Sequence, residues 1–346
     1  MIIVFKSKPE DFRVKEVPYL INSTLTGNGA HQYFVVHKKN HETFDVVSVL
    51  SSYFNIKKEY INFSGLKDKD GITEQLVSIK KTDDNQLSTA GFNDRYYKSE
   101  EEEKYIYLTN TGITGDALSI ASLHGNTFDI VVRSIEETTS KKFFGKETIN
   151  FSFINYYDTQ RFGVPGKEKK THKIGEALIN EKYDLAIEMI NDLEDGEEFK
   201  NNPVKNREDL YERIDKRKLA FYLSSYSSYE WNIALQKMIA RKIDNDKLIY
   251  DQVDDIPYIY LRDSKDLFSL INEDIDYKYK RYIIKNGEIE GTEINRPVII
   301  QVFIRCSEPE VDELYNGKYK CRFRFYLPSG GYATMAIRQL LQRVHF

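Results

Sequence analysis

The chain has 346 residues, more than one hydrophobic core usually organises, so two domains are expected. Its net charge of −4 argues against a protein that coats nucleic acid indiscriminately, although a local basic face remains compatible with it. Two cysteines are too few for a disulfide framework and lack the spacing of a zinc site, which indicates a reducing compartment. The start, MIIVFKSKPEDF, resembles neither a signal peptide nor an anchor, so we expect a soluble, cytoplasmic protein without membrane association.

The first half of the chain predicts strands around one helix. A helix over 43–54 carries Val46, Val47 and Leu50 on one face, together with Tyr53 and Phe54, and Thr43 is expected to cap it. Apolar alternation or β-branched runs predict strands over 31–39, 60–63, 75–80, 104–108 and 126–133. This half is therefore of the α+β type and rich in strands.

The predicted secondary structure becomes helical after Gly166 and returns to strands near the end of the sequence. Helices are predicted over 174–190 and 215–243. Strands follow over 296–305 and 320–328, and a short amphipathic helix over 332–344. A strand-rich start, a helical middle and a strand-rich end indicate one sheet domain interrupted by an insertion.

The stretch FSGLKDKDGITEQ, 63–75, places charged residues in a turn between two predicted strands. Gly65 and Gly71 allow a tight turn that can hold a short side chain over a cleft. Lys67 and Lys69 flank Asp68, and their positive charge is expected to favour its carboxylate form. An oriented carboxylate can serve as a nucleophile or base, but aspartate in such a turn often serves the turn itself.

The same stretch resembles the signature of the TruD family of pseudouridine synthases. Gly65, Lys67, Asp68, Lys69, Thr73 and Gln75 fit it, whereas Gly71 stands where the family usually has alanine, a change expected to loosen the turn. Four more segments are similar to the family in the same order, namely VFKSKPEDFRVKE (4–16), LHGNTFDIVVR (123–133), NYYDTQRFG (155–163) and FYLPSGGYATMAIRQLL (325–341). The resemblance thus covers nearly the whole chain.

The resemblance implies a fold and a division of the chain. The implied fold is a pseudouridine synthase catalytic domain with a mixed, largely antiparallel sheet, interrupted by an inserted α/β TruD-specific domain. The expected limits are 1–165 and 297–346 for the catalytic domain and 166–296 for the insertion.

The resemblance also implies a reaction, in which a uridine of tRNA, of the D-arm position 13 type, becomes pseudouridine. Asp68 matches the catalytic aspartate, and it could attack C1′, add to C6 of uracil or remove a proton from C2′. Neither a metal nor a cofactor is implied, because uracil is both leaving group and returning nucleophile. One alternative is a catalytically impaired RNA-binding protein on the same scaffold; another is a carboxylate-dependent hydrolase of nucleosides or sugars.

Further residues gain roles from the resemblance. Lys6 and Lys67 are expected near the site, holding phosphate or the carboxylate, unless they are ordinary surface lysines. Tyr157 stands where the family usually has a base-stacking phenylalanine, with core packing as the alternative. Asp158 replaces a family glycine and would add a second carboxylate. The residues expected to position the base, backbone or loop are Asn155, Gln160 and Arg161, and for Arg161 a structural ion pair is the alternative.

Basic runs in the middle of the chain are candidates for contacts to the RNA backbone, although most such runs are simply solvated. These candidates are Lys167, Lys169, Lys170, Lys173, Arg213, Lys216 and Arg217. His37 and His41 have no third ligand nearby, so no metal is expected there. Trp231 is expected to anchor the packing of a long helix.

Overall fold

The computed structural model describes residues 4–19, 29–81, 87–119, 122–163, 168–193, 201–263, 265–271, 276–285 and 288–345. The chain forms two compact units. Unit 1 comprises Met1–Phe151, Val302–Ala333 and His345, and unit 2 comprises Ser152–Gln301, Thr334–Val344 and Phe346. The domain limits expected from the sequence remain a prediction.

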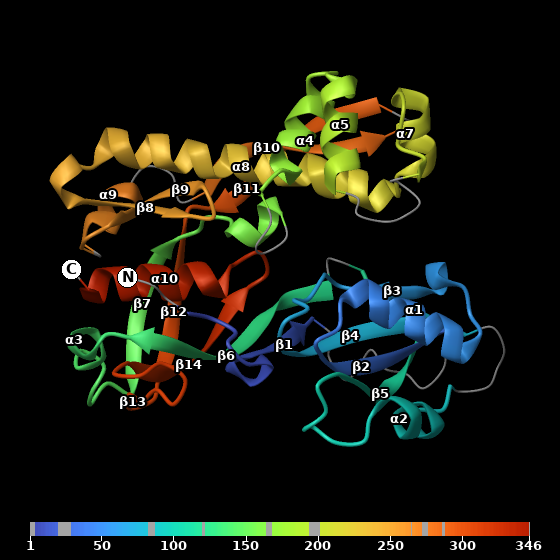
Figure 1. The fold of residues 1–346 in the computed structure, drawn as a ribbon, viewed down its shortest axis with the longest axis horizontal. Coiled ribbons are helices and arrows are strands. Elements are labelled where there is room, and N and C mark those ends of the chain that lie inside the picture. The colour runs from blue at the N-terminus through green and yellow to red at the C-terminus, as the bar shows by residue number, and fades with distance from the viewer. Residues whose placement is uncertain are drawn as a thin grey trace. The chain divides into compact units, whose positions relative to one another are not determined.

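A large sheet dominates the first part of the chain (Figure 1). Its strands are β1 (Phe12–Pro18), β2 (His31–Lys39), β3 (Ile61–Phe63), β4 (Ile72–Lys80), β5 (Tyr105–Thr114), β6 (Leu123–Ile135), β7 (Thr148–Ile154), β12 (Ile299–Cys306), β13 (Glu310–Val311) and β14 (Tyr319–Pro328). They lie in the order β5-β2-β4-β1-β6-β14-β12-β7, with β3 paired to β4 and β13 to β14.

The pairing of these strands agrees with the predicted class. β1 pairs with β4 in parallel, whereas β1–β6, β2–β4, β2–β5, β6–β14 and β12–β14 are antiparallel. The α+β fold with a mixed, largely antiparallel sheet is thereby confirmed. Two cysteines meet in this sheet: Cys306 Sγ of β12 lies 3.1 Å from Cys321 Sγ of β14.

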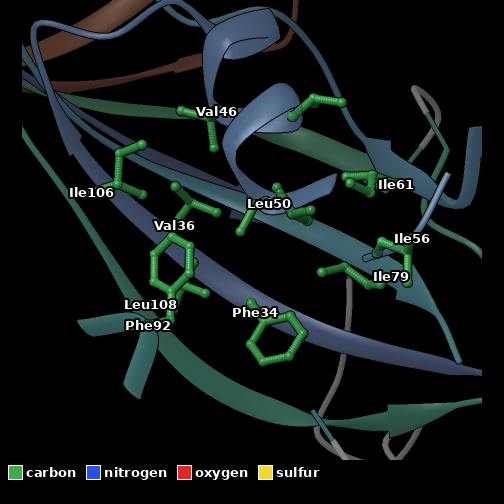
Figure 2. Packing of buried hydrophobic residues seen from close by; sticks show 12 residues of the cluster. Phe34, Val36, Val46, Leu50, Ile56, Ile61, Ile79, Phe92, Ile106 and Leu108 are labelled. Carbon is green, nitrogen blue, oxygen red and sulfur yellow. The ribbon is translucent and has the colours of Figure 1, made fainter. Parts of the chain in front are cut away.

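The described residues of unit 1 include the helices α1 (Thr43–Phe54), α2 (Ala90–Tyr96) and α3 (Glu137–Ser140). Figure 2 shows how Val46 and Leu50 of α1 point toward Val36 of β2, in a core that also contains Phe92 of α2. Val46 and Leu50 are almost fully buried, as their helical spacing predicted. The prediction that Thr43 caps α1 is wrong, because the cap position falls on Glu42 and the Thr43 hydroxyl bonds elsewhere.

Unit 2 is organised around one long helix. Its helices are α4 (Thr171–Ile179), α5 (Tyr183–Leu193), α7 (Arg207–Arg213), α8 (Lys216–Lys242), α9 (Asp266–Ile271) and α10 (Ala333–His345), the last beginning in unit 1. Among the described residues of this unit, β8 (Leu248–Val253) pairs with β9 (Ile256–Leu261), and β10 (Asp276–Lys285) pairs with β11 (Glu288–Pro297). In Figure 1, α4, α5 and α7 gather at one end of α8, and α9, β8 and β9 at the other.

Two details of this unit differ from the sequence prediction. The helix predicted over 174–190 is two helices, because the chain turns after α4 and Glu181 adopts a left-handed backbone conformation with φ +57°. The strand pairs β8–β9 and β10–β11 were not predicted. Within the described part of the chain, no helix combines the length and the apolar character needed to cross a membrane.

Candidate functional site

The loop between β3 and β4 carries the predicted catalytic aspartate. It ends at Gly71, whose φ is +155° and whose carbonyl accepts a hydrogen bond from the Asn40 amide at 3.2 Å. A Cβ atom at Gly71 would lie 2.6 Å from the carbonyl oxygen of Phe12, which is too close for any side chain. Glycine is therefore what this backbone requires, and the expected loosening of the turn stays a prediction.

Asp68 forms an ion pair with a lysine distant in sequence. Its Oδ2 lies 3.0 Å from Lys6 Nζ, and the two side chains are 33% and 13% exposed. The Lys6 ammonium also lies 4.2 Å from the centre of the buried Phe12 ring, a cation–π contact. Lys6 adopts φ +59°, an unusual backbone conformation for a residue with a side chain. These contacts orient a partly accessible carboxylate.

The two lysines next to Asp68 in sequence bind other carboxylates. Lys67 Nζ lies 2.6 Å from Glu16 Oε1, and both side chains are buried. Lys69 Nζ lies 3.7 Å from Glu42 Oε1 at the surface. The ion-pair partner of Asp68 is therefore Lys6, and the expectation that its neighbours in the loop supply that charge is wrong. Lys67 instead fixes the loop to β1.

A residue that was not predicted holds the main chain of Asp68. Lys38, at the end of β2, donates from Nζ to the carbonyl oxygens of Asp68 at 2.7 Å and His41 at 2.6 Å. Burial of this side chain lowers the pKa of Lys38 to about 8. Lys38 shares the inward face of β2 with Phe34 and Val36. A charged residue in line with these apolar residues was the sequence signal that could have identified Lys38 as a functional residue.

Neighbouring polar side chains complete the support of the loop. The Thr43 hydroxyl accepts from the Lys67 amide at 3.1 Å and donates to Gln75 Oε1 at 3.3 Å. Gln75 Nε2 donates to the carbonyl oxygen of Gly65. Glu16 Oε2 accepts from the amide of Leu76 at 2.8 Å. Lys67 and Gln75 of the motif, together with Thr43 of α1, therefore build the loop rather than face solvent.

In unit 2, Tyr157 lies in a cluster of aromatic and cationic groups. The Arg296 guanidinium lies 4.0 Å from the centre of its ring. Its hydroxyl is 2.7 Å from the Tyr279 hydroxyl of β10, and burial raises the pKa of Tyr279 above its ordinary range. The main chain of Tyr157 exchanges hydrogen bonds with the Asn232 amide group of α8. The Tyr157 hydroxyl, which a phenylalanine would lack, is thus hydrogen-bonded to Tyr279.

Asn155 links several elements of unit 2. Its Oδ1 accepts from Arg296 at 2.8 Å, and its Nδ2 donates to the carbonyl oxygen of Pro297 at 2.9 Å. The buried indole of Trp231 donates to the Asn155 carbonyl oxygen at 2.9 Å. The predicted packing role of Trp231 is confirmed, and Asn155 and Trp231 together fix the chain that precedes Tyr157.

The remaining residues of this segment are oriented by hydrogen bonds inside unit 2. The buried Asp158 carboxylate accepts from the Thr159 amide at 2.7 Å and from the Thr334 hydroxyl of α10. Arg161 donates to Ser224 at 2.7 Å and to Ser228 at 3.3 Å, both in α8. The alternative expected for Arg161 was a structural ion pair. The guanidinium does hold structure together, but through these serine hydroxyl groups instead of a carboxylate. Gln160 is half-buried in the single turn Thr159–Phe162.

The basic candidates differ in their accessibility. Lys169 is buried, with Nζ 3.4 Å from Asp254, and Arg213 is bonded to Asp209 and to the carbonyl oxygen of Asn202. The surface ion pairs of Lys170 and Lys173 both involve Glu168. Lys216 and Arg217 are exposed at the start of α8. Lys167 lies outside the described residues.

Comparisons with known proteins agree on one group. A family model described as tRNA pseudouridine synthase D (TruD) matches residues 3–215. The tRNA pseudouridine synthase D of Aquifex aeolicus is 25% identical, over 98% of this chain and 98% of that protein. That of Sulfurimonas denitrificans is 26% identical, over 98% and 95%. A crystal structure of the same type from Methanosarcina mazei has a TM-score of 0.55 at 19% identity, over 98% and 93%.

Proposed function

Because the chain belongs to the tRNA pseudouridine synthase D (TruD) family, we propose that it isomerises a D-arm uridine of tRNA, of the position 13 type, with Asp68 as the catalytic carboxylate. The observation that carries the role of Asp68 is its placement. The carboxylate is partly accessible, its tip is bound by Lys6 at 3.0 Å, and its main chain is fixed by Lys38. A carboxylate held in this way is suited to act on one bound nucleotide.

The reaction breaks the N1–C1′ bond and joins C1′ to C5 of the same uracil, after which the proton on C5 is lost and N1 gains a proton. Atoms balance within the nucleotide and water, because the base leaves and returns. The carboxylate acts at C1′, at C6 or on the C2′ proton, and each route requires an oriented oxygen near the ribose. Lys6 keeps that oxygen oriented in all three.

The uridine must leave its stack before such a carboxylate can reach it, since the glycosidic bond of a stacked base is shielded. We assign base stacking to Tyr157 and support of its segment to Asn155, Gln160 and Arg161. Lys216 and Arg217, which are exposed, are the favoured backbone contacts among the basic candidates. Lys170 and Lys173 require release from Glu168 to serve in the same way.

The role of Asp68 is tested with tRNA that carries tritium at C5 of uridine. Asp68→Asn keeps the size of the side chain and is expected to lower the rate of tritium release at least about 100-fold, with the dissociation constant for tRNA changed by less than about threefold. Asp70→Asn is the matched control, because Asp70 lies in the same loop and is exposed. It should retain the rate of the unaltered protein.

The outcomes separate the competing functions. Full activity of Asp68→Asn would sink the assignment of this residue. Tight tRNA binding without tritium release by the unaltered protein would instead favour the catalytically impaired RNA-binding protein. Replacing the position 13 uridine of the tRNA by cytidine should remove the product, and tritium release that persists from another uridine would overturn the D-arm proposal.

A further inference from the structure

Lys38 is a charged residue in an apolar row. It follows Phe34 and Val36 on the face of β2 that packs against α1, and all three are essentially inaccessible to solvent. Figure 2 shows Phe34 and Val36 pointing into that core. An apolar side chain of similar length would fit such a row without the cost of burying an ammonium group. Packing alone therefore gives no reason for lysine at this position.

The ammonium group is used to join two separate loops. Its hydrogen bonds reach the carbonyl oxygen of His41, just before α1, and the carbonyl oxygen of Asp68. Both acceptors are main-chain atoms, so the contact fixes peptide planes instead of forming an ion pair. Over the residues that the structure describes, no other hydrogen bond reaches the Asp68 carbonyl oxygen.

We propose that Lys38 is a positioning residue for the reaction: by fixing the Asp68 peptide it sets the direction in which the carboxylate leaves the loop. The inference rests on the proposed function of Asp68. The side chain of Asp68 is then held at both ends, at its main chain by Lys38 and at its tip by Lys6. Fixing only the tip would leave the carboxylate free to rotate about Lys6, out of line with the ribose.

The chain offers a matched control in the next residue of the same strand. Lys39 is also buried, and its Nζ lies 2.6 Å from Glu10 and donates to the carbonyl oxygen of Glu100 at 3.2 Å. Because side chains alternate along a strand, Lys39 lies on the opposite face of β2 from Lys38. Lys39→Met thus removes a buried lysine without touching a contact of the Asp68 loop.

The test measures single-turnover rates of tritium release at saturating enzyme, together with tRNA binding. Lys38→Met is expected to slow the chemical step about 100-fold and to change the dissociation constant for tRNA less than about threefold. Lys39→Met should keep the rate within about twofold. Equal rates for Lys38→Met and the unaltered protein would overturn the proposal.

A second variant separates positioning from a general loss of folding. Lys38→Ala leaves a cavity shaped like the lost side chain, and added propylammonium should restore a large part of the rate, whereas propanol should not. If no Lys38 variant folds while Lys39→Met does, or if propylammonium restores nothing in folded Lys38→Ala, the positioning role is overturned. Asp68→Asn in the same assay keeps the two proposals distinct: an active Asp68→Asn contradicts the proposed function, whereas an inactive one beside a fully active Lys38→Met contradicts only this inference.

Discussion

Lys38, which holds the Asp68 loop, is a lysine whose charge is buried at a cost in free energy. Burial is the largest influence on Lys38 and lowers its pKa from 10.5 to about 8. Four charged groups also act on it: Asp68 and Glu42 raise its pKa, and Lys67 and Lys6 lower it. Together these influences make the Lys38 ammonium group lose its proton more readily in the folded chain than in the unfolded chain. Keeping Lys38 charged in the folded protein therefore lowers the free energy of unfolding.

This cost predicts a pH dependence of stability. Between pH 8 and about 10.5 the unfolded chain binds more protons at Lys38 than the folded chain does, so the free energy of unfolding should rise with pH in this window. Relative to Lys38→Met, the unaltered protein should gain up to ~3 kcal/mol from pH 7.5 to pH 10.5. Urea titrations of both proteins at the two pH values measure the difference. Parallel changes in the two proteins would show that Lys38 titrates normally.

Among the secondary-structure elements, the turn into β4 depends on one glycine. Gly71 combines φ +155° with the close approach of the Phe12 carbonyl oxygen, and its own carbonyl bonds Asn40. Alanine, the usual residue of the family at this place, cannot occupy this backbone unless the turn shifts.

Gly71→Ala is accordingly expected to destabilise the protein. The substitution should lower the free energy of unfolding by about 1–3 kcal/mol, because it adds a steric clash and a strained φ. Thermal unfolding followed by circular dichroism measures this. Gly115→Ala is the control, since a Cβ there meets nothing within 4 Å, and it should change the melting temperature little. Equal melting temperatures for the two variants would contradict the role given to Gly71.

Element by element, the sequence was most informative where apolar residues keep a strict period. The apolar run Tyr33 to Val36 in β2 and the helical spacing in α1 predicted both elements with their observed bounds. The β10–β11 hairpin was not predicted, although tyrosine and lysine alternate in β10 as in a strand, because its charged residues were interpreted only as a basic run. Lys6 was expected near the Asp68 carboxylate and does pair with it. Lys38 and Glu16 were missed because they are charged residues at inward-facing positions, and only their three-dimensional neighbours explain them. The roles of the site residues in catalysis remain predictions.

At the scale of the whole chain, bonds between distant segments hold the second unit together. Asp158 accepts from Thr334, 176 positions later in the sequence, and Ile154 exchanges hydrogen bonds with Gln339 of α10. The carboxylate that departs from the family pattern is therefore a link between the Tyr157 segment and the C-terminal helix. Such contacts of high sequence separation cannot be derived from local patterns.

A double-mutant cycle tests this link. Asp158→Ala and Thr334→Val should each lower the free energy of unfolding by about 1–3 kcal/mol. The first leaves the Thr334 hydroxyl and the Thr159 amide without the carboxylate that accepts from them, and the second leaves the buried carboxylate with one hydrogen bond fewer. The double variant should lose clearly less than the sum of the two. Asp158→Asn keeps an acceptor oxygen and should be milder. Strict additivity in urea titrations would show that the two side chains act independently.

The guanidinium of Arg296 on the Tyr157 ring has an electronic consequence. A cation 4.0 Å from the ring centre draws π density toward itself, and it occupies one of the two faces of the ring. For the proposed stacking of uracil on Tyr157, the face that Arg296 covers is therefore closed, and the ring that the uracil would meet is poorer in electrons. Arg296 also donates to Asn155 Oδ1 at 2.8 Å, so the guanidinium that covers this face of the Tyr157 ring is held in place by a side chain of the Tyr157 segment.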